Sequence, residues 1–367
     1  MGQDTGNRAQ DTGNRAQDTD RSDDLNDDQT IPGGTEQLVL CRDRATGTRA
    51  VIAVDDTTLG PALGGVRYVR YPAEAAAVAE ARRLARGMTL KNACADIPYG
   101  GGKSVILLED GQGPREQVME AFGRFVDRLG GAYVPGVDMG TDVEDLAVIG
   151  KVAPDVSCDH VDPSPYTALG VLASIEAAAR VAGFDGLRGL RVVVQGAGHV
   201  GGTLARLLAE RSADVLVADV STDRAAEAAA AAGGAVVPVD EVTTTPCDVL
   251  APCAAARVVN DATVDGLPCR IVAGAANDVL AHRQLDGRLA ERGILYVPDF
   301  VANAGGVVQI HAGRAGWDEA GTEAAVLRIG ERVEAMLRRA SAEGCTPLEV
   351  AERVASERIG RTVRIPA

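Results

Sequence analysis

Two lysines stand close together in the sequence and could bind or deprotonate a substrate. Lys91 and Lys103 lie in an apolar, glycine-rich stretch, and the chain has only three lysines against 34 arginines. Lysine can lose its proton when it is desolvated or near another cation, whereas arginine stays charged. Both could be ordinary surface residues, but the scarcity of lysine favours a chemical role. A base would need its pKa lowered from about 10.4 towards neutrality.

Three glycines at 100–102 precede Lys103 and Ser104. A phosphate-binding P-loop would need glycine at Ile97 and would open a helix, whereas this segment precedes an expected strand at 104–108. We therefore interpret the glycines as bare backbone that lets a small substrate lie close to Lys103.

Asp138 lies between Gly136 and Gly140, after an apolar run at 132–134. It could be a turn residue or an acid placed at the end of a strand. The residues alone leave both interpretations open.

Gly196, Gly198 and Gly201 form a Gly-x-Gly-x-x-Gly turn between an expected strand, 191–194, and an expected helix, 200–211. The first glycine permits a tight turn, the second lets a pyrophosphate approach and the third lets helix and strand pack closely. The helix N-terminus then faces the phosphates. The turn predicts a dinucleotide site.

Asp219 ends the next expected strand, 213–219. A carboxylate there can accept hydrogen bonds from both ribose hydroxyls and would repel a 2′-phosphate, which favours NAD over NADP. Alternatively, Asp219 only opens the turn before Ser221. The nearby Arg224 weakens the preference for NAD.

The elements around these residues indicate an α/β protein of two domains. Strands and helices alternate from 191 to 297, which predicts a parallel, doubly wound sheet of the Rossmann type. Before it we expect a hairpin of strands 37–41 and 49–54 and helices at 73–88, 115–129 and 166–183, and after it helix at 320–360.

Composition excludes several classes of protein. The 367 residues are 46% hydrophobic with net charge −15, too apolar for a disordered chain and too acidic to bind nucleic acid or anionic membrane by bulk charge.

Residues 3–9 recur at 10–16, and residues 1–34 hold eight Asp and three Arg, so we expect a disordered acidic tail. We expect no membrane span and no secretory signal. Seven scattered cysteines and four histidines predict a cytoplasmic protein without a metal site.

Six motifs occur in an order that resembles the leucine/phenylalanine/valine branch of the Glu/Leu/Phe/Val amino-acid dehydrogenase family. They lie at 59–65, 88–93, 100–104, 138–141, 196–201 and 298–306. The resemblance covers residues 35–360 and implies a substrate-binding and oligomerisation domain at 35–165, completed by helices at 320–360. A Rossmann NAD-binding domain would occupy 166–319, with a cleft between the two domains.

The resemblance also implies a reaction and a role for each matched residue. The family deaminates an L-amino acid oxidatively and reversibly to a 2-oxo acid and ammonia, and a homo-oligomer is expected. Lys91 would bind the substrate carboxylate, Lys103 would be the catalytic base and Asp138 would shuttle protons. Asn277 would touch substrate or nicotinamide and Thr167 would lie near the nicotinamide. NAD would be bound by Gly196, Ala197, Gly198, His199, Val200, Gly201 and Asp219.

The side-chain pocket implied by the resemblance is formed by Leu59, Gly136, Val307 and Ile310. Leu59 stands where glutamate-specific relatives place lysine, and the branched Val307 and Ile310 favour leucine, valine or isoleucine. The stretch 245–310 looks more like the phenylalanine enzymes, so a phenylalanine preference stays open. A non-catalytic NAD-binding relative is the other alternative, disfavoured because Lys91, Lys103 and Asp138 are all retained.

Four features depart from the family pattern. Met139 replaces the usual valine after Asp138, and the stretch between Val156 and Pro163 is short. Both termini also differ, through the repetitive N-terminal tail and a short C-terminus that ends at Ala367. The short stretch would affect cofactor contacts or closure.

Overall fold

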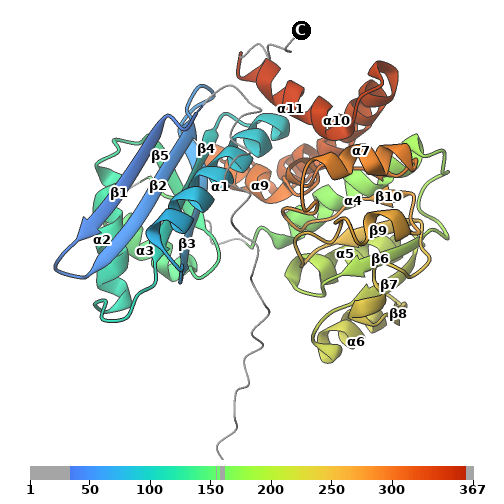
Figure 1. Ribbon diagram of the computed structural model, residues 1–367, viewed down its shortest axis with the longest axis horizontal. Helices are drawn as coiled ribbons and strands as arrows, with labels where there is room; N and C mark the ends of the chain where they lie inside the picture. The colour runs from blue at the N-terminus through green and yellow to red at the C-terminus, as the bar shows by residue number, and fades with distance from the viewer. Residues whose placement is uncertain (1–33, 154, 158–161, 361–367) are drawn as a thin grey trace, which may run out of the picture. The chain divides into compact units, whose positions relative to one another are not determined.

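The computed structural model describes residues 34–153, 155–157 and 162–360. The repeat expected to form a disordered tail lies outside the described residues, as does most of the short stretch before Pro163. The elements of the described chain form two β-sheets with helices packed around them (Figure 1).

The first sheet is mixed and has the strand order β1-β2-β4-β3-β5. Its strands are β1 (Gln37–Asp43), β2 (Thr48–Asp56), β3 (Ala62–Val69), β4 (Gly100–Leu107) and β5 (Tyr133–Val137). The expected hairpin is confirmed, since β1 and β2 pair antiparallel with Asp43 opposite Thr48. Strand β3 was not expected, and it runs parallel to both β4 and β5.

Helices cover both faces of this sheet because successive strand residues point to opposite sides. Helix α1 (Glu74–Ala95) buries a stripe of alanines against Val51, Ala53 and Val105. Helix α2 (Arg115–Asp127) packs Phe122 against Ile52 and Ile106, on the other face. The short α3 (Val143–Gly150) packs beside α2.

The glycines at 100–102 correct one interpretation of the sequence. They lie inside β4 and not in a loop before it, and protein atoms fill the space around them. A Cβ on Gly100 would lie 1.7 Å from the Asp56 carbonyl oxygen, and one on Gly102 would lie 2.7 Å from the Tyr133 ring. The glycines therefore let β4 pack against its neighbours, because protein atoms occupy the space that their side chains would need.

The second sheet is fully parallel, with the order β11-β10-β9-β6-β7-β8. This is the doubly wound dinucleotide-binding order, so the expected Rossmann-type sheet is confirmed. The strands are β6 (Arg191–Gln195), β7 (Asp214–Ala218), β8 (Ala235–Val236), β9 (Val249–Pro252), β10 (Ile271–Val272) and β11 (Leu295–Tyr296). The connecting helices are α5 (His199–Glu210), α6 (Thr222–Ala231) and α7 (Gln284–Glu291), with 3-10 turns η2 (Val239–Glu241) and η3 (Val264–Gly266).

The helical region expected at 320–360 consists of two helices, α10 (Glu319–Glu343) and α11 (Pro347–Arg358). Gly344 ends α10 at a positive φ of 64°, and a capping box between Thr346 and Glu349 starts α11. Helix α10 packs on α4 (Ser164–Val181), whereas α11 packs on α1. The end of the chain thus returns to its first part, but the domain boundaries remain predictions.

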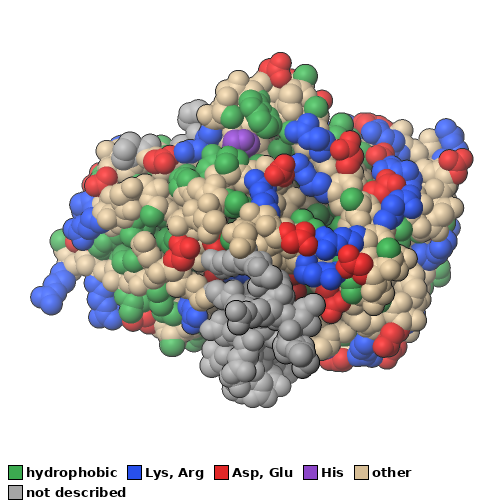
Figure 2. Space-filling model, turned by 90° about the horizontal axis from the view of Figure 1, so that it is seen from above, with side chains coloured by type: hydrophobic (Ala, Val, Ile, Leu, Met, Phe, Trp, Pro, Cys, Tyr) green, Lys and Arg blue, Asp and Glu red, His purple; other side chains and the backbone are tan. Residues whose placement is uncertain are grey.

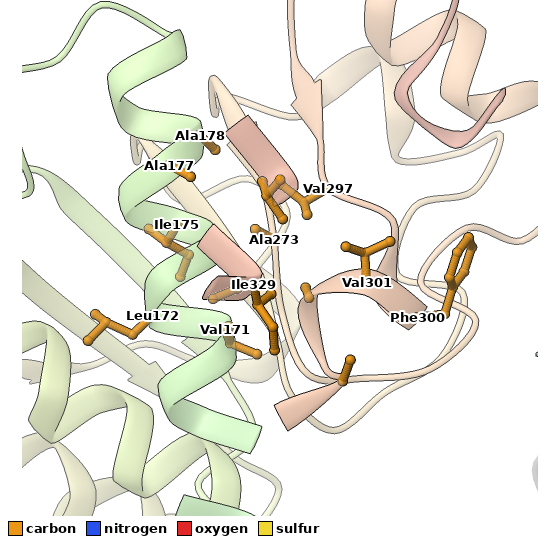
Figure 3. Close-up of a cluster of buried hydrophobic side chains, with 14 of the residues drawn as sticks. Val171, Leu172, Ile175, Ala177, Ala178, Ala273, Val297, Phe300, Val301 and Ile329 are labelled. Atoms are coloured by element: carbon orange, nitrogen blue, oxygen red, sulfur yellow. The ribbon is translucent and has the colours of Figure 1, made fainter. Parts of the chain in front are cut away.

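A hydrophobic core around α4 joins the parallel sheet to the C-terminal helices (Figure 3). Val171 and Ile175 of α4 turn towards three residues from other elements. Ala273 directly follows β10, Val297 directly follows β11, and Ile329 lies on α10. Helices α8 (Asp299–Ala302) and α9 (Gly305–Ala315) also pack on α4. In the described part of the chain, no helix combines the length and apolarity needed to cross a membrane.

The glycine packing in β4 predicts a stability difference between two Gly→Ala substitutions. A Cβ at Gly101 would lie 2.1 Å from Thr89 Oγ1 and 2.2 Å from the Thr89 amide nitrogen, so Gly101→Ala should lower the free energy of unfolding by about 3 kcal/mol. Gly87 lies within α1 and a Cβ there would meet nothing within 4 Å, so Gly87→Ala should raise the free energy of unfolding by roughly 1 kcal/mol. Denaturant unfolding of the two variants measures the difference; equal stabilities would contradict this packing.

Candidate active site

Lys103 and Asp138 meet in an enclosed position on the mixed sheet. Lys103 lies on β4 with its side chain 6% exposed, and its Nζ contacts Oδ2 of Asp138, which follows β5. Strand β3 runs between these two strands. Gly65 of β3 leaves the necessary space, because a Cβ there would lie 2.7 Å from Cβ of Asp138. The sheet thus brings together the two residues that the sequence marked for proton transfer.

The loop around Asp138 is fixed by its own hydrogen bonds. The Thr141 hydroxyl accepts from the Asp138 amide at 3.0 Å and donates to the Val66 carbonyl at 2.7 Å. The Thr141 amide donates back to the Asp138 carbonyl, which closes a turn. Asp138 is therefore both a turn residue and an acid at a strand end, so the two interpretations left open by the sequence are compatible.

Burial and neighbouring cations favour the neutral form of Lys103. Burial lowers the pKa of Lys103 well below its ordinary value, and the charges of Arg67 and Lys91 lower it further, while Glu80 opposes them. The contact with the Asp138 carboxylate, like the charge of Glu80, favours the charged form of Lys103. A buried lysine with a lowered pKa is a candidate general base.

Lys91 lies near the C-terminal end of α1 and reaches the parallel sheet. Its Nζ lies 3.5 Å from Oδ1 of Asn277, which follows β10. Burial lowers the pKa of Lys91, and the charges of Asp299 and Asp278 oppose that shift. A further contact links α1 to the loop after β10, because Arg83 on α1 donates to both carboxylate oxygens of Asp278 at 2.8 and 2.7 Å.

The predicted pocket residues lie on three different segments. Gly136 lies in β5, where a Cβ would lie 2.7 Å from the Ser157 hydroxyl. Leu59, Val307 and Ile310 are partly buried and pack against one hydrophobic cluster, the last two from α9. Their shared apolar surroundings are compatible with the expected pocket, and their roles stay predictions.

The glycine turn has the geometry expected of a dinucleotide site. Gly196 adopts φ of 100°, which other residues rarely adopt, and a Cβ on Gly201 would lie 1.8 Å from the Gly196 carbonyl oxygen. A Cβ on Gly198 would meet no atom within 4 Å, which leaves its outer side open at the N-terminus of α5. The first and third glycines are needed by the fold, and the second leaves room for a phosphate.

Asp219 lies beside this turn. Its Oδ2 accepts from the Ala197 amide at 2.7 Å, and its Oδ1 accepts from the Ser221 amide and from Arg224, both at 2.8 Å. Burial alone would raise the pKa of Asp219, but these hydrogen bonds outweigh burial and lower it, so the carboxylate stays ionised.

Of the remaining cofactor candidates, His199 and Val200 begin α5 after the turn, and Thr167 lies on α4. His199 is 87% exposed and Val200 is partly buried. Thr167 lies on α4 against α9, since a Cβ on Gly306 would lie 2.9 Å from its hydroxyl.

The sequence did not single out Arg67, Glu80 or Asn303, which the structure places in or beside the site. Asn303 donates to Oδ1 of Asn277 at 2.8 Å and to the Ala275 carbonyl at 3.1 Å, which orients the Asn277 amide. Arg67 bridges Asp138 and Glu80. Asn303 stands in the quoted 298–306 motif, but Arg67 lies on the unexpected strand β3 and gave no signal of its own.

Comparisons with known proteins identify the family of this chain. Residues 36–153 match the family described as Glu/Leu/Phe/Val dehydrogenase, dimerisation domain, and residues 216–362 match Glutamate/Leucine/Phenylalanine/Valine dehydrogenase. The chain is 39% identical to leucine dehydrogenase of Bacillus subtilis over 337 residues, covering 90% of this chain and 92% of that protein. It is 41% identical to valine dehydrogenase of Streptomyces coelicolor over 343 residues, covering 89% and 93%.

A solved structure of a relative has the same fold as this chain. The crystal structure of L-tryptophan dehydrogenase from Nostoc punctiforme superposes with a TM-score of 0.80 at 38% identity, covering 89% of this chain and 96% of that chain. The chain therefore belongs to the Glu/Leu/Phe/Val dehydrogenase family, in its hydrophobic amino-acid branch.

Proposed function

We propose that this protein catalyses the reversible oxidative deamination of an apolar L-amino acid with NAD, giving the 2-oxo acid, ammonia and NADH. The observation that carries the proposal is the contact between buried Lys103 and Asp138, with Lys91 at the end of the adjacent helix. The names of its relatives, which are leucine, valine and tryptophan dehydrogenases, support an apolar substrate.

Each residue of the site has a step in this reaction. Lys91 binds the substrate carboxylate through its ammonium group, beside Asn277. NAD, when bound, would supply the acceptor for the hydride of the substrate α-carbon. Asp138 would take a proton from the substrate ammonium group, so that a protonated imine would be left on the substrate. Lys103, in its neutral form, takes a proton from the water that adds to the imine carbon. Asp138 then passes that proton to the nitrogen of the resulting carbinolamine. The C–N bond breaks, the hydroxyl proton leaves with the departing ammonia, and the 2-oxo acid remains.

The residues at the glycine turn fit a dinucleotide. Gly198 and the amides at the N-terminus of α5 would hold the pyrophosphate, with Gly196, Ala197, His199, Val200 and Gly201 around it. Asp219 would accept hydrogen bonds from the adenosine ribose, for which its ionised carboxylate is suited. Thr167 would lie near the nicotinamide. The acidic group at this position favours NAD over NADP.

Leu59, Gly136, Val307 and Ile310 are proposed to contact the substrate side chain. The branched residues on α9 favour leucine, valine and isoleucine. One methylene in such a pocket changes binding by about 0.8 kcal/mol, so activity on several apolar amino acids is expected, phenylalanine among them.

The proposed setting is a homo-oligomer in the cytoplasm with small-molecule partners only. The match of residues 36–153 to a dimerisation domain supports self-association. The six cysteines in the described ranges are unpaired, as in a reducing compartment. Acidic and basic side chains are interleaved over the face in Figure 2, which gives nucleic acid no uniformly basic surface there.

A substrate panel with a Lys103 variant tests the proposal. The purified protein should reduce NAD with leucine, valine, isoleucine or phenylalanine at alkaline pH, where neutral Lys103 predominates. Lys103→Ala should lower kcat by on the order of 10³-fold, because the base is lost, while NADH binding measured by fluorescence stays unchanged. Lys151→Ala is the matched control, because Lys151 is 56% exposed and pairs with Glu116. Failure of every apolar amino acid to support turnover would overturn the proposed function.

The choice of cofactor is tested at Asp219. Asp219→Asn keeps a side-chain oxygen that can accept from the Ala197 amide but removes the negative charge that would repel a 2′-phosphate. The ratio of kcat/KM for NAD to that for NADP should fall about tenfold or more, equivalent to roughly 1.4 kcal/mol. Asp214→Asn, at the exposed start of β7, is the control with the same charge change. An unchanged ratio in Asp219→Asn would contradict this role.

A further inference from the structure

Arg67 contacts two carboxylates through separate nitrogens. Its Nε donates to Oδ1 of Asp138 at 3.2 Å, and its Nη1 donates to Oε1 of Glu80. Asp138 follows β5 and Glu80 lies on α1, so the Arg67 guanidinium on β3 links the loop after β5 to helix α1. Its side chain is 18% exposed, which makes the contacts more than a solvent-screened surface pair.

The chain of contacts continues on both sides of Arg67. Glu80 also accepts from the Tyr71 hydroxyl at 3.0 Å, which holds its carboxylate from a second direction. Asp138 uses its other oxygen, Oδ2, to contact Lys103. Arg67 and Lys103 thus bind opposite oxygens of one carboxylate, and the rotation of that carboxylate is fixed between them.

We propose that Arg67 is a positioning residue of the active site, which holds the Asp138 carboxylate against the Lys103 amine while Glu80 holds the guanidinium in place. The inference rests on the proposed function for its effect on turnover. The planar guanidinium is needed because a lysine ammonium at the end of a flexible stem cannot offer two donors in a fixed fork.

The charge of Arg67 has a second consequence at Lys103. The groups facing Lys103 are Arg67 on β3, Lys91, Arg83 and Glu80 on α1, and Asp138 after β5. Burial lowers the pKa of Lys103 and the three cations act in the same direction, whereas the two carboxylates favour its charged form. Removal of the Arg67 charge should therefore raise the pH at which Lys103 loses its proton.

The three lysines of the chain allow a measurement that does not need turnover. Trace acetylation with acetic anhydride at a series of pH values, read by peptide mass spectrometry, follows Lys91, Lys103 and Lys151 separately. In Arg67→Gln the midpoint for Lys103 should rise by about one pH unit, while that for Lys151 stays at its wild-type value. The acid limb of kcat/KM for the amino acid should move in the same direction.

Two further variants separate charge from geometry. Arg67→Lys keeps the charge, so the Lys103 midpoint should stay near its wild-type value while kcat falls about tenfold or more through loss of the fork. Arg70→Gln removes an exposed charge that pairs with Asp110 at the end of the same strand, and should change neither quantity.

A Lys103 midpoint in Arg67→Gln identical to the wild type, with kcat also unchanged, would overturn the role of Arg67. If the wild-type protein turns over no apolar amino acid but the midpoint still moves, the proposed function fails and the contact of Arg67 with the Lys103 site stands.

Discussion

The burial of one lysine against one aspartate is the constraint on which the rest of the active site depends. A charged ammonium loses much of its hydration inside a sheet, and this cost is what brings the neutral form of Lys103 within reach. The cost is tolerable only because Asp138 and its supporting residues supply a partner of opposite charge. Burial and the paired carboxylate therefore favour opposite protonation states of Lys103.

The mixed sheet produces this arrangement through its strand order and its glycines. Strand β3 separates β4 from β5, so Lys103 and Asp138 approach each other across it only where β3 lacks a side chain, at Gly65. The glycines at 100–102 let β4 pack closely against three other elements, since their missing side chains would meet Asp56 of β2, Thr89 of α1 and Tyr133 of β5. Helix α1 then brings Lys91 to the loop after β10, where Asn303 fixes Asn277.

Much of this could be predicted from the sequence because the strongest signals are local. In the turn at 196–201, Gly196 allows the tight turn, Gly198 leaves open space and Gly201 allows close packing, so the glycine pattern alone predicts this geometry. The alternation of strands and helices after residue 191 predicts the parallel sheet. Lys103 and Lys91 stood out through the rarity of lysine. The two interpretations of Asp138 could not be resolved, because the answer depends on strand order, which is a long-range property.

The errors and omissions have the same physical origin. Strand β3 has glycines at 64 and 65 and a charged Arg67, so its β-propensity is weak and its burial comes from the neighbouring strands. The role of Arg67 is invisible until β3 is placed between β4 and β5. The glycines at 100–102 were assigned to substrate because the atoms that occupy their surroundings come from segments distant in sequence.

The central claim, that the Asp138 carboxylate exchanges protons with the reacting nitrogen beside Lys103, is tested most directly by Asp138→Asn. This substitution preserves the size and an oxygen acceptor of the side chain but removes its acid–base function. With L-leucine and NAD, kcat should fall by on the order of 10³-fold while NADH still binds with its wild-type affinity. A variant that retains wild-type kcat would contradict the account.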